Sequence, residues 1–453
     1  MTIPTKFLYF FLLRSFLLQE APGEAQPITK VAGGNDHSLF LKSDGSLWAM
    51  GENLSGELGD GFYGGGPSPG YGTNRPVQVL ARDVTAIAVG VECSHNLLIK
   101  SDGSLWTWGA GSYGEWGNSP FSDTNRPTMI VASNVVAIAG GCWHSLFVKN
   151  DGSLWAMGRN DGGQLGDGTY VNTNQPEQIV ASNVTAVAAG QNHSLFLKSD
   201  GSLWVMGTNR FGQLGDGTYN NSTRPEQIVA SNVTAIAAGA HHSLFLKKDG
   251  SVWGMGISLI PDLPNGFYGN TNRPEQILTS NVVAIAAGSM HSLFLKSDGS
   301  LWGMGENGGG VLGDGTYTGT NQPEQIVASN VIAIGAGEAH SLFIKRDGSL
   351  WAMGNNNCGQ LGDGTYNNTN RPEQIVINPN YNLISAQLLS RDRVQFSFFG
   401  NAGTVYTLEH AFSLAPPNWI PQATNLANSF GALVFTNTPD PTTNNFWRIR
   451  AVQ

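Results

Sequence analysis

A phrase of fifteen residues recurs seven times in this chain of 453 residues, and it constrains the fold more than any other feature. Its clean copies read His-Ser-Leu-Phe-Leu-Lys-Ser-Asp-Gly-Ser-Leu-Trp-x-Met-Gly. The copies begin at His37, His95, His144, His193, His242, His291 and His340. From the second copy onward the histidines stand 49 residues apart, and the first spacing is 58 residues. A fixed period of this length indicates a propeller or a repeat array rather than independent domains.

Each repeat predicts four short strands. In the fourth repeat these are residues 184–190, which are small and end on glycine, the alternating stretch 193–198, the return stretch 202–207 and residues 226–229. Asp200-Gly201 between the second and third strands predicts a hairpin of type I′, a turn that needs positive φ angles. Four strands in each of seven repeats predict an all-β fold, a seven-bladed β-propeller over residues 26–379. We expect the first strands to line the central channel, and Leu, Phe and Trp of the second and third strands to fill the space between blades.

The ends of the repeat region bear on how the ring closes. The first copy begins with a first strand at residue 28, and the last copy ends with a fourth strand at residue 376. We expect the two termini to complete one shared blade, which would leave no open sheet edge.

The segments outside the repeats predict a leader and a second module. Residues 1–25 combine a basic start, a short apolar run that Arg14 interrupts and small residues near Ala25, which is typical of a signal peptide. We therefore expect a secreted or periplasmic protein, with a cytoplasmic protein as the alternative. The apolar run is too short to span a membrane. Residues 380–453 alternate apolar and polar positions between Gly, Pro and Asn turns, which predicts a small all-β, sandwich-like module.

The repeats resemble the regulator of chromosome condensation family. The matching pieces are Gly-x-x-His-Ser, the Asp-Gly hairpin, Leu-Trp-x-Met-Gly and Gly-Gln-Leu-Gly-Asp-Gly, the last at residues 163–168, 212–217 and 359–364. The resemblance implies a seven-bladed propeller. The member that gives the family its name exchanges nucleotide on a nuclear GTPase and binds nucleosomes. The regular repeats are closer in style to bacterial secreted members, such as one that inhibits β-lactamases by docking one face over them.

Composition and motifs give no sign of a catalytic or cofactor site. The seven histidines lie in different repeats without a metal-ligand spacing, so we expect each to be a structural hydrogen-bonding group. No nucleophile elbow, phosphate-binding loop or zinc motif is present in the sequence. The three cysteines, Cys93, Cys142 and Cys358, do not form a disulfide framework, although Cys93 and Cys142 occupy similar loops of adjacent repeats. We expect no cofactor, no bound metal and no enzymatic activity.

The differences between the repeats indicate where a partner binds. The first-to-second and third-to-fourth connections share one face of a propeller and vary between copies, whereas the hairpins of the opposite face hardly vary. A constant framework with variable, aromatic-rich loops is typical of a binding scaffold. The candidate binding residues are Asn35, Asp36, Tyr63, Tyr71, Glu92, Tyr113, Trp116, Trp143, Asn192, His241, Leu259, Met290 and Glu338.

The leading hypothesis is therefore an exported, non-enzymatic, monomeric protein that binds a protein partner through its variable loops. The formal net charge of −9 argues against nucleic acid as the partner. Two other functions remain open, a nucleotide-exchange regulator of a small GTPase and a carbohydrate-active or lyase propeller. Neutral drift of surface loops is the remaining explanation of the sequence differences between the loops of the seven repeats.

Overall fold

The computed structural model describes residues 26–64, 72–90, 92, 94–117, 122–257 and 270–375, and six strands between residues 384 and 451. The chain divides into two compact units, residues 1–375 and residues 376–453. The predicted signal peptide, residues 1–25, lies outside the described residues. No helix long and apolar enough to cross a membrane occurs in the described part of the chain.

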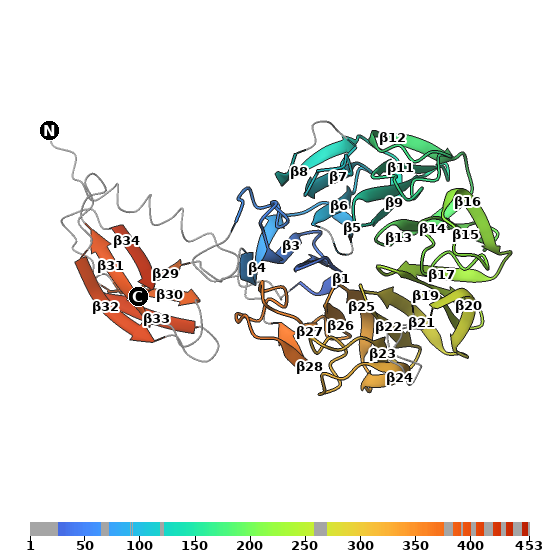
Figure 1. Ribbon diagram of the computed structural model, residues 1–453. Coiled ribbons are helices and arrows are strands. Elements are labelled where there is room, and N and C mark those ends of the chain that lie inside the picture. Colours follow the sequence, from blue (N-terminus) through green and yellow to red (C-terminus); the bar gives the residue numbers. More distant parts are fainter. Residues whose placement is uncertain are drawn as a thin grey trace. The chain divides into compact units, whose positions relative to one another are not determined.

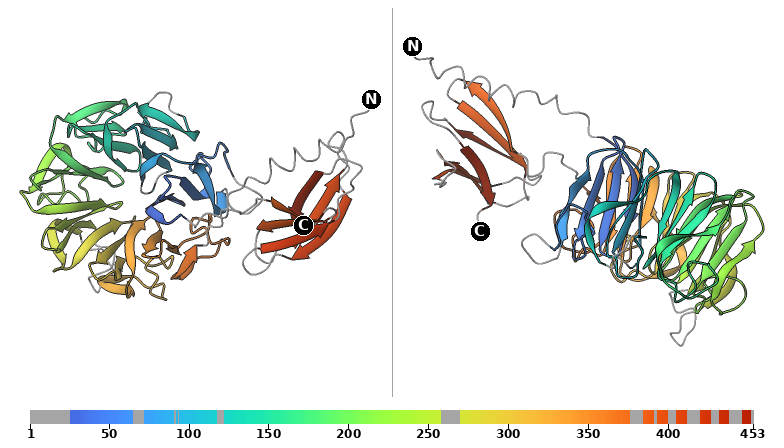
Figure 2. Two further views of the ribbon diagram at one scale, coloured as in Figure 1. Left: turned by 180° about the vertical axis from the view of Figure 1, so that it is seen from behind. Right: turned by 90° about the horizontal axis from the view of Figure 1, so that it is seen from above.

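The first unit is a ring of seven four-stranded antiparallel sheets, as the repeats predict (Figure 1). Blades one to seven follow chain order, and seen from the side they form a disc (Figure 2). The first strands of the blades are β1 (Ile28–Gly33), β5 (Val84–Val89), β9 (Val135–Gly140), β13 (Val184–Ala189), β17 (Val233–Ala238), β21 (Val282–Ala287) and β25 (Val331–Ala336). Their alanine and glycine residues line a central channel of about 210 Å³, so the small residues of these strands leave it open.

The second and third strands carry the repeated phrase. The second strands are β2 (His37–Lys42), β6 (His95–Lys100), β10 (His144–Lys149), β14 (His193–Lys198), β18 (His242–Lys247), β22 (His291–Lys296) and β26 (His340–Lys345). The third strands are β3 (Leu47–Glu52), β7 (Leu105–Gly109), β11 (Leu154–Gly158), β15 (Leu203–Gly207), β19 (Val252–Ile257), β23 (Leu301–Gly305) and β27 (Leu350–Gly354). The outer strands are β4 (Gly72–Leu80), β8 (Thr124–Val131), β12 (Thr173–Val180), β16 (Ser222–Val229), β20 (Asn270–Leu278), β24 (Thr320–Val327) and β28 (Thr369–Ile375).

The hairpin between the second and third strands differs from the predicted type I′ turn. In blade four Gly201 has a φ of 77°, but Asp200 does not share this left-handed conformation. The Gly201 N–H donates to the Lys198 carbonyl at 2.9 Å, and the Ser202 N–H donates to Asp200 Oδ1 at 2.9 Å. This is a type I turn followed by a left-handed glycine, because the aspartate caps the turn with its side chain instead of adopting a positive φ.

The phenylalanines of the second strands are fully buried, but the repeated tryptophans are only half-buried. In blade four Phe196 packs between blades, and the Lys198 ammonium lies 4.1 Å from the centroid of the Trp204 ring. The Trp204 Nε1–H donates to Ser202 Oγ at 2.9 Å. Equivalent lysine–tryptophan contacts occur in all seven blades. The prediction that tryptophan fills the interior between blades is therefore wrong in part, since each indole is capped by a lysine.

The expectation of a blade shared between the two ends is also wrong. Strands β1–β4 form the first blade and β25–β28 the seventh, so each blade consists of four consecutive strands. The ring closes by contacts between these two blades. Ser38 Oγ lies 2.8 Å from His340 Nε2, and the Glu338 N–H donates to the Gly34 carbonyl at 2.8 Å. Because the repeat region begins with a first strand and ends with a fourth strand, both terminal blades are complete, and neither needs a strand from the other end of the chain.

The described residues of the second unit form strands. The unit contains the sheets β29–β30–β33 and β32–β31–β34, each of three antiparallel strands. The strands are β29 (Ile384–Ser390), β30 (Arg393–Phe399), β31 (Val405–Ala411), β32 (Ile420–Leu426), β33 (Ala432–Asn437) and β34 (Phe446–Ala451). Phe396, Leu408 and Phe435, which come from both sheets, are buried.

Candidate protein-binding face

The two variable connections of each blade meet on one face, which we call the variable face. In every blade the residue after the third-strand glycine donates its backbone N–H to the carbonyl of the residue before the repeated histidine. The pairs are Glu52–Asp36, Ala110–Ser94, Arg159–Trp143, Thr208–Asn192, Ile257–His241, Glu306–Met290 and Asn355–Ala339, at 2.7–3.1 Å. In each blade the framework thus places two residues side by side whose type differs from one blade to the next.

A third variable position comes from the preceding blade, where its third-to-fourth connection reaches the same pair. We call each such group of three a junction triad. The triads with described contacts are Cys358–Asp36–Glu52 between blades seven and one, Tyr113–Trp143–Arg159 between blades two and three, Gly162–Asn192–Thr208 between blades three and four, Phe211–His241–Ile257 between blades four and five, and Gly309–Ala339–Asn355 between blades six and seven.

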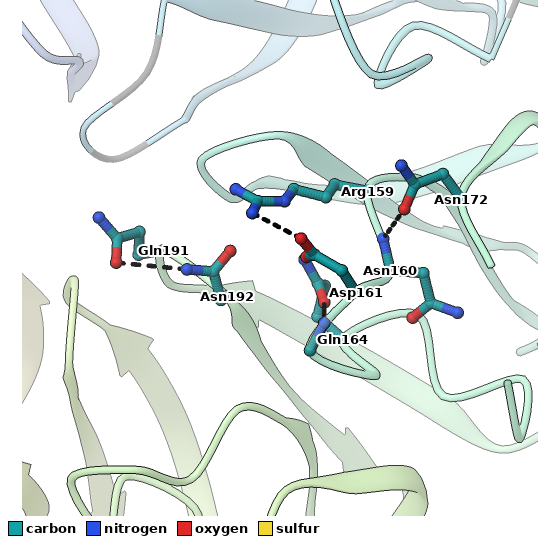
Figure 3. Close-up of polar contacts among 8 residues, drawn as sticks. Arg159, Asn160, Asp161, Gln164, Asn172, Gln191 and Asn192 are labelled. Carbon is teal, nitrogen blue, oxygen red and sulfur yellow. Dashed lines mark hydrogen bonds and ion pairs between the residues drawn. The ribbon is translucent and has the colours of Figure 1, made fainter. Parts of the chain in front are cut away.

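The triad between blades two and three is a stack of two aromatic rings and a guanidinium. The Tyr113 and Trp143 ring centroids lie 5.4 Å apart. The Arg159 guanidinium carbon lies 4.6 Å from the Trp143 centroid and 5.2 Å from the Tyr113 centroid. Arg159 also forms an ion pair with the exposed Asp161 at 2.6 Å, beside Asn192 (Figure 3). All three members of the triad are half-buried, so part of each side chain faces solvent.

The triad between blades four and five repeats this chemistry in a weaker form. The Phe211 and His241 rings lie 4.6 Å apart, and the exposed Arg210 places its guanidinium 5.8 Å from the Phe211 ring. Burial lowers the pKa of His241, and Arg210 acts in the same direction, while Glu92 opposes it. This side of the ring therefore presents aromatic rings with two arginines.

The triad between blades seven and one is acidic. Burial raises the pKa of Glu52 to about 7, and the carboxylates of Glu57, Asp36 and Glu338 add to the shift. Glu338 has its pKa raised to about 7 by burial and by Asp36 and Glu92. None of these carboxylates forms an ion pair with a lysine or arginine of the described residues. The variable face is thus polarised, with carboxylates at blades seven and one and arginines at blades three and four.

One group of metal-ligating residues arises in this acidic triad within the described part of the chain. Ligand atoms of Asp36, Glu52 and Cys358 lie within 4.8 Å of one another. Their separation in sequence explains why no spacing motif indicated them. Burial, together with the carboxylates of Asp36 and Glu52, raises the pKa of the Cys358 thiol to about 12, so this thiol stays protonated near neutral pH. It is therefore a poor nucleophile.

Glu92 reaches across the ring. Its loop is two residues longer than its counterparts, and its φ is 61°. Its carboxylate accepts hydrogen bonds from Gln191 Nε2, and from Ser289 Oγ in blade six. This predicted binding residue therefore links the inner loops of three blades, which makes it a structural tie as well as part of the face.

The other predicted residues separate into three groups. Trp116 is only 7% exposed and donates its Nε1–H to the Ala110 carbonyl at 2.6 Å, so it is not an available surface residue as predicted. Its position matches Leu165 in the next repeat, a core position. Tyr63 is exposed and Asn35 donates to Asp36 Oδ2 at 3.2 Å. Tyr71 and Leu259 lie outside the described residues.

The sequence prediction missed the last member of each junction triad and, in two triads, the first member as well. Last members such as Glu52 and Arg159 directly follow the repeated glycine of the third strand, and the first members Phe211 and Cys358 precede a glycine of the third-to-fourth connection. Aligning the repeats at these positions would have found them, since their identity changes from blade to blade. Cys142, in the loop beside Trp143, is disulfide-bonded and Cys358 is free. Cys93, the partner considered for Cys142, lies outside the described residues.

Comparison with known proteins gives matches to family models over most of the ring. The family model of the RCC1-like domain matches residues 13–260. Models of the regulator of chromosome condensation (RCC1) repeat match residues 282–310 and 331–360, and residues 298–344 and 347–387.

Individual relatives are similar over shorter stretches. The X-linked retinitis pigmentosa GTPase regulator homolog of Caenorhabditis elegans is 36% identical over 100 residues, 22% of this chain and 7% of that protein. The human E3 ubiquitin-protein ligase HERC2 is 33% identical over 107 residues, 23% of this chain and 2% of that protein. Among solved structures, Prp20p of Saccharomyces cerevisiae superimposes with a TM-score of 0.63 at 21% identity, over 80% of this chain and 90% of that one. The match to Prp20p bears on the fold alone.

Proposed function

This chain belongs to the family of proteins with RCC1-like repeats, and from that premise we propose that it is an exported, non-enzymatic protein that binds a protein partner through its variable face. The propeller supplies the constant framework, and the junction triads supply the recognition. Residues 384–451 take no part in the proposal.

The observation that carries this proposal is the Tyr113–Trp143–Arg159 stack. Tyrosine, tryptophan and arginine are the residue types that contribute most to protein interfaces. Here they come from two blades and occupy positions that other junctions fill with glycine, alanine or asparagine. The fold does not require them at these positions, because Ala339 stands in blade seven where Trp143 stands in blade three.

Two further features support the location and the partner class. The disulfide at Cys142 favours an oxidising compartment, in agreement with the leader-like residues 1–25. The net charge of −9 and the carboxylates of the variable face disfavour nucleic acid.

The name of the Caenorhabditis elegans relative favours a second candidate, a regulator of a GTPase. The two candidates differ in location. Recovery of the protein from the medium or periplasm with its N-terminus near residue 26 supports the binding protein, whereas an intact Met1 in the cytosol together with accelerated nucleotide release from a small GTPase supports the regulator.

The partner-binding proposal is tested with a pair of tryptophan variants. Trp143→Ala should weaken binding of a partner captured from extracellular extract by about 2 kcal/mol, as interface aromatics often do. Its free energy of unfolding should fall by no more than about 1 kcal/mol, the size of a cation–π contact. Trp155→Ala is the control, because Trp155 stacks on Phe147 and Lys149 in the framework. It should lower stability by about 3 kcal/mol and leave the affinity of the folded fraction unchanged. If the Trp143 variant binds the partner with unchanged affinity, the proposal is wrong, and the differences between the loops are explained by neutral drift.

A further inference from the structure

A pair of opposite charges in blade three has no counterpart at the equivalent positions of the other described connections. Arg159 directly follows the third-strand glycine, and Asp161 stands two residues later in the connection to β12. The equivalent positions in the other connections that the structure describes there hold Glu52 and Leu54, Ala110 and Ser112, Thr208 and Arg210, Glu306 and Gly308, and Asn355 and Asn357. The framework of the propeller therefore does not require this pair.

The Arg159 guanidinium is held by two aromatic rings. Its central carbon lies 4.6 Å from the Trp143 ring centroid and 5.2 Å from the Tyr113 ring centroid, while 22% of the side chain stays exposed. A free arginine side chain has many rotamers, and fixing them on binding costs conformational entropy. Because the two rings already restrict Arg159, less entropy is lost when a ligand binds it.

Asp161 uses only part of this guanidinium. Its Oδ2 lies 2.6 Å from Nη2 of Arg159, and Arg159 forms no other ion pair within the described residues (Figure 3). The Nε of Arg159 is buried and has no hydrogen-bond partner. A carboxylate can accept from Nε and Nη2 in two parallel hydrogen bonds, and such bidentate pairs are stronger than single contacts. Arg159 therefore keeps unused capacity to bind a carboxylate.

Asp161 is a weak competitor for this position. Its side chain is 54% exposed, and ion pairs open to solvent contribute little because water competes with them and salt screens them. A carboxylate on the surface of a docked protein excludes this water, so its attraction to Arg159 acts in a lower dielectric. The cost of removing both charges from water is offset only if both hydrogen bonds form. The geometry of Arg159 permits both.

We propose that Arg159 binds the side-chain carboxylate of an aspartate or glutamate on the surface of the protein partner, in the place that Asp161 occupies in the free protein. The inference rests on the proposed function, and it names the chemistry that the aromatic stack of the variable face recognises. Arg210, which forms no ion pair within the described residues, adds positive charge on the same side of the ring. Asp161 keeps Arg159 paired until the partner displaces it.

The test compares two probes of the same shape on the full-length protein. N-acetyl-glutamate amide carries a carboxylate where N-acetyl-glutamine amide carries a neutral amide, and the ¹⁵N–¹H signal of Arg159 Nε reports binding. In the variant Asp161→Asn the acidic probe should shift this signal in a saturable titration, and the neutral probe should not. Without the substitution the affinity for the acidic probe should be about threefold lower, because Asp161 competes.

A lysine variant separates bidentate binding from simple charge attraction. In the Asp161→Asn background, Arg159→Lys should lower the affinity for the acidic probe by about fivefold, because lysine keeps the charge but lacks the planar fork of donors. The indole N–H signal of Trp143 reports binding in this variant. An unchanged affinity would contradict the proposed geometry.

Three further results would overturn the proposal. They are the absence of a saturable shift at Arg159 in the Asp161→Asn variant, equal shifts with the two probes, and equal shifts at Arg159 and Arg210. A failure of the proposed function is a separate outcome, because the titration needs no partner. With the captured partner, Arg159→Gln should weaken binding by about tenfold. If Trp143→Ala weakens that binding and Arg159→Gln does not, the proposed function stands and this inference is wrong.

Discussion

At the scale of the residue, the repeated histidine joins each blade to the next. His144 Nε2 lies 2.9 Å from Ser194 Oγ, and the Ser194 hydroxyl donates to the Gln164 carbonyl. A carbonyl only accepts, so the imidazole must donate through Nε2 and carries its proton there. The contact between histidine Nε2 and a side chain of the next blade recurs at all seven junctions, with Asn96 in place of serine beside His37. The prediction of structural hydrogen bonding is confirmed, although the partner, one blade away, was not evident from the sequence.

Burial of these histidines predicts acid sensitivity. Desolvation lowers the pKa of all seven to about 3 or 4, whereas the unfolded groups titrate near 6.5. Between these values unfolding takes up protons, so stability is lost as the pH falls from about 6.5 toward 4. Five carboxylates act in the opposite direction because burial raises their pKa values, to about 7 for Glu52, Glu115 and Glu338 and upward for Asp36 and Glu57, but they are fewer than the seven histidines. Urea unfolding from pH 7.5 to 4.5 should give a falling midpoint; a constant or rising midpoint would contradict the buried neutral histidines.

The glycine that stands three residues before six of the seven histidines predicts a second effect. A Cβ on Gly190 would lie 2.2 Å from His193 Cε1 and 2.3 Å from the Gly239 carbonyl oxygen. Gly190→Ala should therefore lower the free energy of unfolding by about 2 kcal/mol or more, through overpacking at the junction. Gly308→Ala is the matched control, because the nearest atom to its Cβ would be 3.6 Å away. Its stability should change by less than about 0.5 kcal/mol. Equal stabilities of the two variants in denaturant titrations would exclude this role of Gly190.

At the scale of the element, the sequence predicted the strands better than the contacts between them. Period, alternation and Asp-Gly turns located all four strands of a blade, because these signals are local. The hairpin type was wrong, since Asp200 caps Ser202 through its side chain. The junction triads could not be predicted as groups, because Tyr113 and Arg159 meet only through the packing of two blades. Trp116 was taken for a surface aromatic because its position was not aligned with Leu165.

At the scale of the whole molecule, closure by contacts rather than by a shared blade predicts tolerance of new termini. Every outer strand joins the next first strand by three residues, as at 181–183. A circular permutant tests this. It joins residue 376 to Ile28 through an Ala-Ser-Asn linker and has its new termini at residues 181–183, so every blade stays intact. It should unfold cooperatively with a melting temperature close to that of residues 26–376. A second permutant opened between β14 and β15, within blade four, should be less stable. Equal melting of the two permutants would argue against blades as the units of the ring.

The variable face as the site of partner binding is tested most directly by hydrogen exchange of the captured complex. Binding should slow exchange in the loops at residues 34–36, 142–143, 191–192 and 289–290, which lie on the variable face. The hairpins of the opposite face, such as residues 199–202, should exchange as in the free protein. Protection confined to those hairpins, or to residues 384–451, would contradict the account.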